Sequence, residues 1–201
     1  MRVLGVDPGL TRCGIGVVEG PPAAPVLVAA ELVRTPREDA LELRLDALHR
    51  AVAGAIARYR PDAVAVERVL FSSNVRSAMA TGQAAGVALL AAAQAGVPVT
   101  PYSPNDVKFT VAGHGGADKD EVGRMVAMQL RLSAVPRPAD VADALAIALT
   151  HLARARMGAV GEAGAPAASA RAGGGSRGWE AVLDNPHLRV AGGTAPPRRT
   201  T

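Results

Sequence analysis

The chain has 201 residues, of which 49% are hydrophobic and 2% aromatic, and its net charge is +4. This length allows one ordinary domain with an appendage, and so few aromatic residues disfavour a broad base-stacking surface. The single cysteine, Cys13, excludes an intrachain disulfide and a CxxC metal cluster. The N-terminus lacks the apolar core of a signal peptide, and the longest apolar run, residues 84–93, is too short for a membrane span. We therefore expect a soluble cytoplasmic protein without membrane association.

The first half of the chain predicts four strands and two helices. Two apolar segments flank the short sequence DPGLTR, which is typical of a hairpin turn. Farther along, leucine, valine and isoleucine recur every three or four residues, as in an amphipathic helix. Ser73 or Asn74 is the expected cap of the Ala-rich helix that follows. The predicted strands cover residues 2–7, 13–19, 26–33 and 63–67, and the predicted helices cover residues 38–59 and 74–96.

The second half predicts one more strand and three helices. The strand over residues 97–100 contains Pro98, which cannot donate to a ladder and therefore predicts a sheet edge. Antiparallel strands followed by parallel ones joined through helices predict an α/β fold with a mixed five-stranded sheet flanked by helices. From Gly158 the composition turns rich in Gly, Ala and Pro, which predicts a domain over 1–157 and a disordered tail over 158–201. The three predicted helices cover residues 104–111, 118–131 and 138–156.

Two of the predicted strands end in a carboxylate. LGVD ends at Asp7 and AVAVE ends at Glu67. A buried carboxylate costs several kcal/mol unless a positive or hydrogen-bonding group meets it, so Asp7 is either a turn former or part of a site. Because the ends of parallel strands tend to meet at one edge of a sheet, we expect Asp7 and Glu67 to be neighbours.

A second acidic pair, Asp140 and Asp143, is spaced for one face of a helix. Asp140 alone also suits a helix cap. Four converging carboxylates would raise one another's pKa, and hard cations such as Mg²⁺ relieve that repulsion. Two such ions suit phosphodiester hydrolysis, which also accounts for the basic net charge.

Three motifs together resemble the RuvC-type Holliday junction resolvases. They are GVDPG at 5–9, AVE at 65–67 and DVADALAIALTH at 140–151, and the segments NVRSAMATGQAAGVALLAA and VKFTVAGHGGADKDEV match in type and spacing. The resemblance covers roughly residues 1–155. It implies an RNase H-like fold and a homodimeric endodeoxyribonuclease that nicks opposite strands of a four-way DNA junction, leaving 5′-phosphate ends, in homologous recombination and DNA repair. It further implies two Mg²⁺ per active site, which Mn²⁺ can replace, and RuvA and RuvB as partners.

The resemblance also implies which residues act. Its two basic positions fall on Lys108 and Lys119, the only lysines of the chain. The aromatic junction wedge of the family falls at Leu70, although Phe71 is the better stacking candidate, and Arg76 is a candidate phosphate contact. The family's catalytic acids, which are also its metal ligands, fall on Asp7, Glu67, Asp140 and Asp143.

Other interpretations remain beside this one. One face of the second predicted helix carries small residues at a spacing of four, namely Ala78, Gly82 and Gly86. This face suits either the family's dimer interface or packing within one chain. A non-catalytic junction-binding module would use the same basic face but has no reason to gather four acids. An ATPase of the actin and sugar-kinase type needs a second glycine-rich phosphate loop, and GHGGADK at 113–119 lacks the spacing of one.

Overall fold

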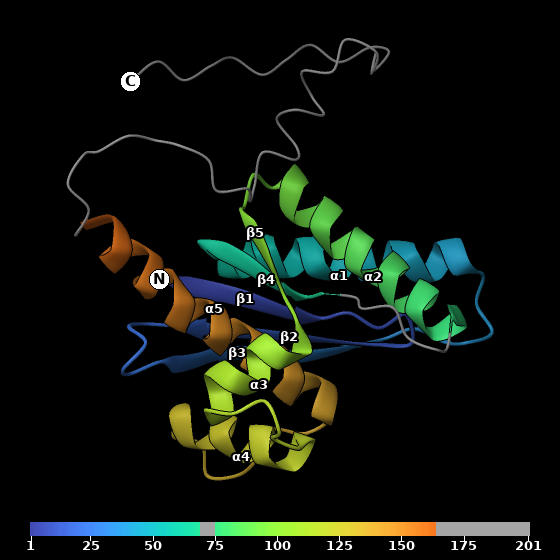
Figure 1. Cartoon of the computed structure of the whole chain (residues 1–201). Coiled ribbons are helices and arrows are strands. Elements are labelled where there is room, and N and C mark those ends of the chain that lie inside the picture. Colours follow the sequence, from blue (N-terminus) through green and yellow to red (C-terminus); the bar gives the residue numbers. More distant parts are fainter. Residues whose placement is uncertain (69–74, 164–201) are drawn as a thin grey trace, which may run out of the picture. The chain divides into compact units, whose positions relative to one another are not determined.

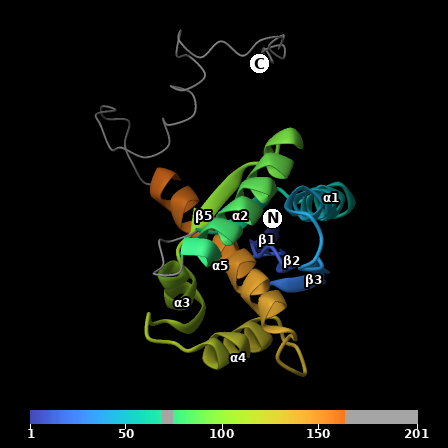
Figure 2. The ribbon, with the colours of Figure 1, turned by 90° about the vertical axis from the view of Figure 1, so that its right-hand side faces the viewer.

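The computed structural model describes residues 1–68 and 75–163, those after Ala155 by their backbone alone. Within these residues five strands form one mixed sheet in the order β3-β2-β1-β4-β5, and helices cover both of its faces (Figures 1 and 2). The predicted five-stranded α/β architecture is thus confirmed. The elements are β1 (Arg2–Asp7), β2 (Arg12–Glu19), β3 (Val26–Arg34), α1 (Leu41–Tyr59), β4 (Ala63–Glu67), α2 (Val75–Gln94), β5 (Val99–Tyr102), α3 (Pro104–Ala112), α4 (Lys119–Gln129) and α5 (Ala139–Ala163).

Strand pairing brings the ends of β1 and β4 together. β2 runs antiparallel to both β1 and β3, whereas β1, β4 and β5 run parallel to one another. Val6 pairs with Val66 in the parallel register. Asp7 and Glu67, one residue farther along, therefore leave their strands at the same edge of the sheet.

Side-chain alternation along the strands separates two hydrophobic cores. Leu4, Val6 and Val66 point to the face that α1 and α2 cover, whereas Val3 and Ala65 point to the face that α3, α4 and α5 cover. Because successive side chains of a strand point to opposite faces, Asp7 and Glu67 share the second face. The acids thus lie on the α5 side of the sheet.

Glycines let α5 lie directly on β1 and β2. A Cβ built on Gly5 would lie 2.1 Å from the backbone oxygen of Ala144. One on Gly16 would lie 2.8 Å from atoms of Leu145, and Gly16 is the cross-strand partner of Gly5. Since no side chain fits between helix and sheet at these positions, the first turns of α5 are held beside Asp7.

Several boundaries differ from those predicted. The strand predicted at 97–100 lies at Val99–Tyr102, although it is the edge strand as expected and contains Pro101. α1 begins at Leu41 rather than at residue 38. α5 continues to Ala163, past its predicted end at 156, and includes Gly158 and Gly161, because each glycine weakens a helix by only about 1 kcal/mol. Residues 158–163 of the tail predicted over 158–201 therefore belong to α5. The rest of that tail and the predicted caps at 73–74 lie outside the described residues.

None of the helices in the described ranges is long and apolar enough to cross a membrane.

Candidate active site

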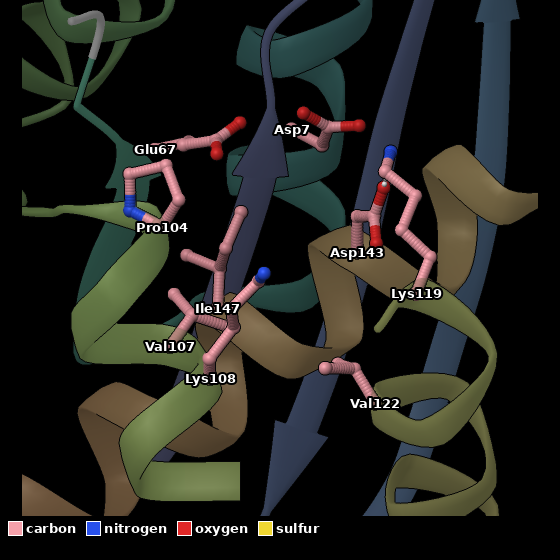
Figure 3. A pocket seen from close by; sticks show the side chains of 9 residues that line it. All are labelled: Asp7, Glu67, Pro104, Val107, Lys108, Lys119, Val122, Asp143 and Ile147. Atoms are coloured by element: carbon pink, nitrogen blue, oxygen red, sulfur yellow. Dashed lines mark hydrogen bonds and ion pairs between the residues drawn. The ribbon is translucent and has the colours of Figure 1, made fainter. Parts of the chain in front are cut away.

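Three carboxylates from three elements line one pocket of about 130 Å³ (Figure 3). Asp7 comes from the end of β1, Glu67 from the end of β4, and Asp143 from the second turn of α5. The predicted closeness of Asp7 and Glu67 is thus confirmed. The remaining lining residues come from α3, α4 and α5: Pro104, Val107, Lys108, Lys119, Val122 and Ile147.

Asp7 is the most perturbed acid of the pocket. Burial raises its pKa, the negative charges of Glu67 and Asp143 raise it further, and together with a hydrogen bond to Glu67 they bring it to about 8. Burial likewise raises the pKa of Glu67, against the opposing effect of its hydrogen bond with Asp7. The Asp7 carboxyl therefore stays protonated near neutral pH, because ionising two adjacent buried carboxylates costs too much free energy. Its O–H donates a hydrogen bond to the Glu67 carboxylate.

Asp143 is paired with a lysine from the next helix. Lys119, the first residue of α4, donates from Nζ to Oδ2 of Asp143 at 3.1 Å. This hydrogen bond and the charge of Asp143 raise the pKa of Lys119, so the ammonium stays protonated. Asp118 caps the helix by accepting from the backbone N–H of Glu121, which places Lys119 at the mouth of the pocket.

Asp140 lies beside the pocket rather than in its lining. Its Oδ2 accepts from two nitrogens of Arg12, with the Nε at 2.9 Å. Asp140 still contributes to the raised pKa of Asp7, so it lies within electrostatic reach. Arg12 was not predicted from the sequence. Its position two residues before Gly14, on the sheet face that carries Asp7, was the one signal that could have indicated it.

Lys108 reaches the pocket from α3, a helix that is firmly placed. Ser103 and Asp106 form a capping box at its first turn. Asp106 also forms an ion pair of 2.9 Å with Arg154 on α5. α3 is therefore tied to the same helix that carries Asp143, and Lys108 and Asp143 line one pocket.

The structure does not place the predicted wedge. Leu70 and Phe71 lie outside the described residues, in the segment that follows Glu67 and Arg68. Arg76 lies exposed on the first turn of α2.

Among the described residues, no group of three or more acidic, histidine or cysteine side chains has an arrangement that would hold a metal ion. Asp140 and Asp143, two of the four predicted ligands, are bound to Arg12 and Lys119 instead. The donor set nevertheless suits a hard cation, since it consists of carboxylate oxygens alone, and burial and neighbouring negative charges raise the pKa of Asp7.

Comparison with known proteins gives one consistent family. A family model described as "Crossover junction endodeoxyribonuclease RuvC" matches residues 3–151. A curated relative with the same description, from Salinispora arenicola, is 54% identical over 176 residues, which cover 87% of this chain and 99% of the relative.

Solved structures agree with the sequence matches. The structure described as T. thermophilus RuvC in complex with Holliday junction substrate is 46% identical and superposes with a TM-score of 0.76 over 79% of this chain and 96% of its own. The yeast mitochondrial Holliday junction resolvase Ydc2 is 12% identical, with a TM-score of 0.56 over 75% of this chain and 78% of its own, and is similar in fold alone.

Proposed function

This chain belongs to the family of RuvC crossover junction endodeoxyribonucleases, and we propose that the pocket of Asp7, Glu67 and Asp143 is where it hydrolyses a phosphodiester bond. The chain is a Holliday junction resolvase of homologous recombination, with the RNase H-like fold that its motifs predict. Both carboxylates and ammonium groups line the pocket, and each kind of group suits a different part of that hydrolysis.

The observation that carries the proposal is the burial of Asp7 against Glu67. Burial, together with the neighbouring charge of Glu67, raises the pKa of Asp7 to about 8, which destabilises the folded protein. A module that only binds junctions gains nothing from this cost, because negative charge beside a phosphate repels it. A hydrolytic site does gain, since the same carboxylates can bind cations or orient water.

We infer that divalent cations, two per site and normally Mg²⁺ with Mn²⁺ able to replace it, are bound by the four acids. Asp7 and Glu67 would hold them at the sheet edge, where a cation relieves the repulsion between the two carboxylates. Asp143 and Asp140 would join after leaving Lys119 and Arg12. When bound, such ions activate a water molecule and stabilise the leaving oxygen.

The two lysines suit the phosphate. Lys108 and Lys119 reach one pocket from α3 and α4, and both carry compact ammonium groups. We propose that they bind the non-bridging oxygens of the scissile phosphate and neutralise the charge that develops there. Hydrolysis then leaves a 5′-phosphate and a 3′-hydroxyl. The wedge role of Phe71 or Leu70 and the phosphate contact of Arg76 stay predictions.

An exposed apolar stripe on α2 supports a homodimer. Val75, Met79 and Leu89 are 66%, 61% and 41% exposed, and together with Gly82 and Gly86 they follow the alternating four- and three-residue spacing of a helix-pairing seam. A Cβ on either glycine would meet no atom of the described residues within 4 Å, so no other described element packs there. A two-fold dimer would present two active sites to a junction that itself has near two-fold symmetry.

Family membership also supports RuvA and RuvB as partners and the cytoplasm as the place of action, and we include both in the proposal.

The test is cleavage of a mobile four-way junction by the full chain with Mg²⁺. We expect paired, symmetric nicks with ligatable 5′-phosphate ends, and no cleavage of a linear duplex with the same sequence. Junction binding without nicking across a range of Mg²⁺ and Mn²⁺ concentrations would favour the binding module instead.

A further inference from the structure

Arg12 joins the start of β2 to the first turn of α5. Strand alternation places Arg12 on the same face as Gly14, the face on which α5 lies. Both its Nε and its Nη2 donate to the same oxygen, Oδ2 of Asp140. Charge-assisted hydrogen bonds of this kind are stronger than neutral ones and fix the direction of the carboxylate. Asp140 is therefore already neutralised by a cation that belongs to the chain.

We propose that Arg12 is a positioning residue that holds Asp140 beside the acidic pocket and so competes with divalent cations for this carboxylate. The proposal rests on the metal site inferred above. It is supported by the difference between two acids on one helix: Asp143 lines the pocket, whereas Asp140, three residues earlier and bound to Arg12, does not.

The ion pair between Arg12 and Asp140 is exposed enough for a divalent cation to replace Arg12. The side chain of Arg12 is 41% exposed and that of Asp140 is 24% exposed. Water competes with an ion pair that is only partly buried, so a doubly charged cation can displace the guanidinium without opening the core. While Arg12 holds Asp140, however, the site has three acids available instead of four. The apparent cation affinity then equals the intrinsic affinity multiplied by the fraction of molecules in which Asp140 is free.

Arg44 provides a matched control. It lies next to the same turn and donates to the Thr11 hydroxyl at 2.9 Å and to the Thr35 hydroxyl at 3.0 Å. No ion pair joins it to an acid of the described residues. Replacing Arg44 removes a nearby positive charge but leaves Asp140 bound to Arg12.

The experiment is titration of the metal-free full chain with Mn²⁺, without DNA, following free Mn²⁺ by electron paramagnetic resonance. Arg12→Gln is expected to bind Mn²⁺ about tenfold more tightly, the gain that follows if Arg12 leaves Asp140 free in about one wild-type molecule in ten. Arg12→Lys, which keeps the charge but loses the two-nitrogen contact, should fall between Arg12→Gln and wild type. Arg44→Gln should bind as wild type does.

A double substitution separates this role from a general charge effect. In an Asp140→Asn background, Arg12→Gln should no longer change Mn²⁺ affinity, because the carboxylate through which it acts is gone. An equal tightening in that background would overturn the proposal, as would unchanged or weaker binding by Arg12→Gln alone. If neither wild type nor any variant binds Mn²⁺, and the junction is cut without divalent ions, the inferred metal site fails as well. Binding by wild type with no effect of Arg12→Gln would overturn only the role of Arg12.

Discussion

The backbone oxygen of Asp140 lies 1.9 Å from the point that a Cβ on Gly14 would occupy. Helix and strand are therefore in direct backbone contact at the place where the acids gather. Gly14 is also the cross-strand partner of Asp7. This contact sets how far the α5 acids stand from the β1 acid, and a larger residue at position 14 would move them apart.

Gly14→Ala is therefore expected to destabilise the fold and to slow cleavage. Overpacking of this kind typically costs about 1–3 kcal/mol, and here the atom in the way is backbone, which cannot rotate aside. Thermal unfolding and junction cleavage measure the two effects. Gly54→Ala on α1 is the control, since its Cβ would meet nothing within 4 Å and alanine favours a helix by about 1 kcal/mol. Equal melting temperatures for Gly14→Ala and wild type would contradict the close contact.

Asp7→Asn is expected to abolish nicking, to retain junction binding and to stabilise the metal-free protein. The folded state holds the Asp7 proton up to about pH 8, whereas the unfolded chain releases it near the ordinary pKa of 3.8. Between these values folding requires proton uptake, so stability falls as the pH rises. Asparagine has no carboxyl to protonate, so the variant folds without this proton uptake. In EDTA the variant should melt above wild type at about pH 9, and the gap should shrink toward about pH 4.

Asp46→Asn is the matched control for that experiment. Asp46 lies on the surface of α1 with Arg50 as its partner, and its replacement should leave both the melting profile and cleavage nearly unchanged. If Asp7→Asn lost junction binding and folding together, the role of Asp7 would be structural rather than catalytic.

Replacing either lysine of the pocket should greatly lower the cleavage rate and leave the stability of the fold nearly unchanged. Lys119 and Lys108 lie at the surface of the pocket, so Lys119→Ala and Lys108→Ala remove charge without leaving a core cavity. Loss of a group that stabilises developing charge typically costs about 10²-fold or more in rate. Single-turnover nicking of prebound junction measures this effect apart from affinity. Wild-type single-turnover rates with weaker junction binding would limit the lysines to binding.

Met79→Arg on α2 should convert a dimer into a monomer. Met79 is 61% exposed in the middle of the apolar stripe, and two like charges facing each other across a two-fold axis repel. Light scattering coupled to size-exclusion chromatography gives the mass. Val26→Arg serves as the control because Val26 is equally exposed, at 61%, but lies on β3. A monomeric wild type would contradict the homodimer, and a dimeric Met79→Arg would place the interface elsewhere.

Local pattern was enough to find the main elements and the acids. Strand alternation and helix periodicity act over a few residues, so the ends of β1 and β4 were predicted without error, and Asp7 and Glu67 with them. The three-residue spacing of Asp140 and Asp143 likewise placed both acids in the first turns of α5. The end of α5 was missed because Gly158 and Gly161 indicate a tail by composition, whereas a glycine within a helix costs only about 1 kcal/mol and does not stop it.

The sequence by itself thus determined that Asp7 and Glu67 end two strands and that Asp140 and Asp143 begin one helix, because the residues that order each strand and helix are neighbours in the chain. The tertiary structure alone decided which cation each of the two α5 acids meets. Arg12 and Asp140 are 128 positions apart, and Lys119 and Asp143 are 24 apart, on elements whose separation no local pattern specifies. That separation depends on backbone contact between α5 and the glycines of β1 and β2, a property of packed surfaces rather than of any one segment.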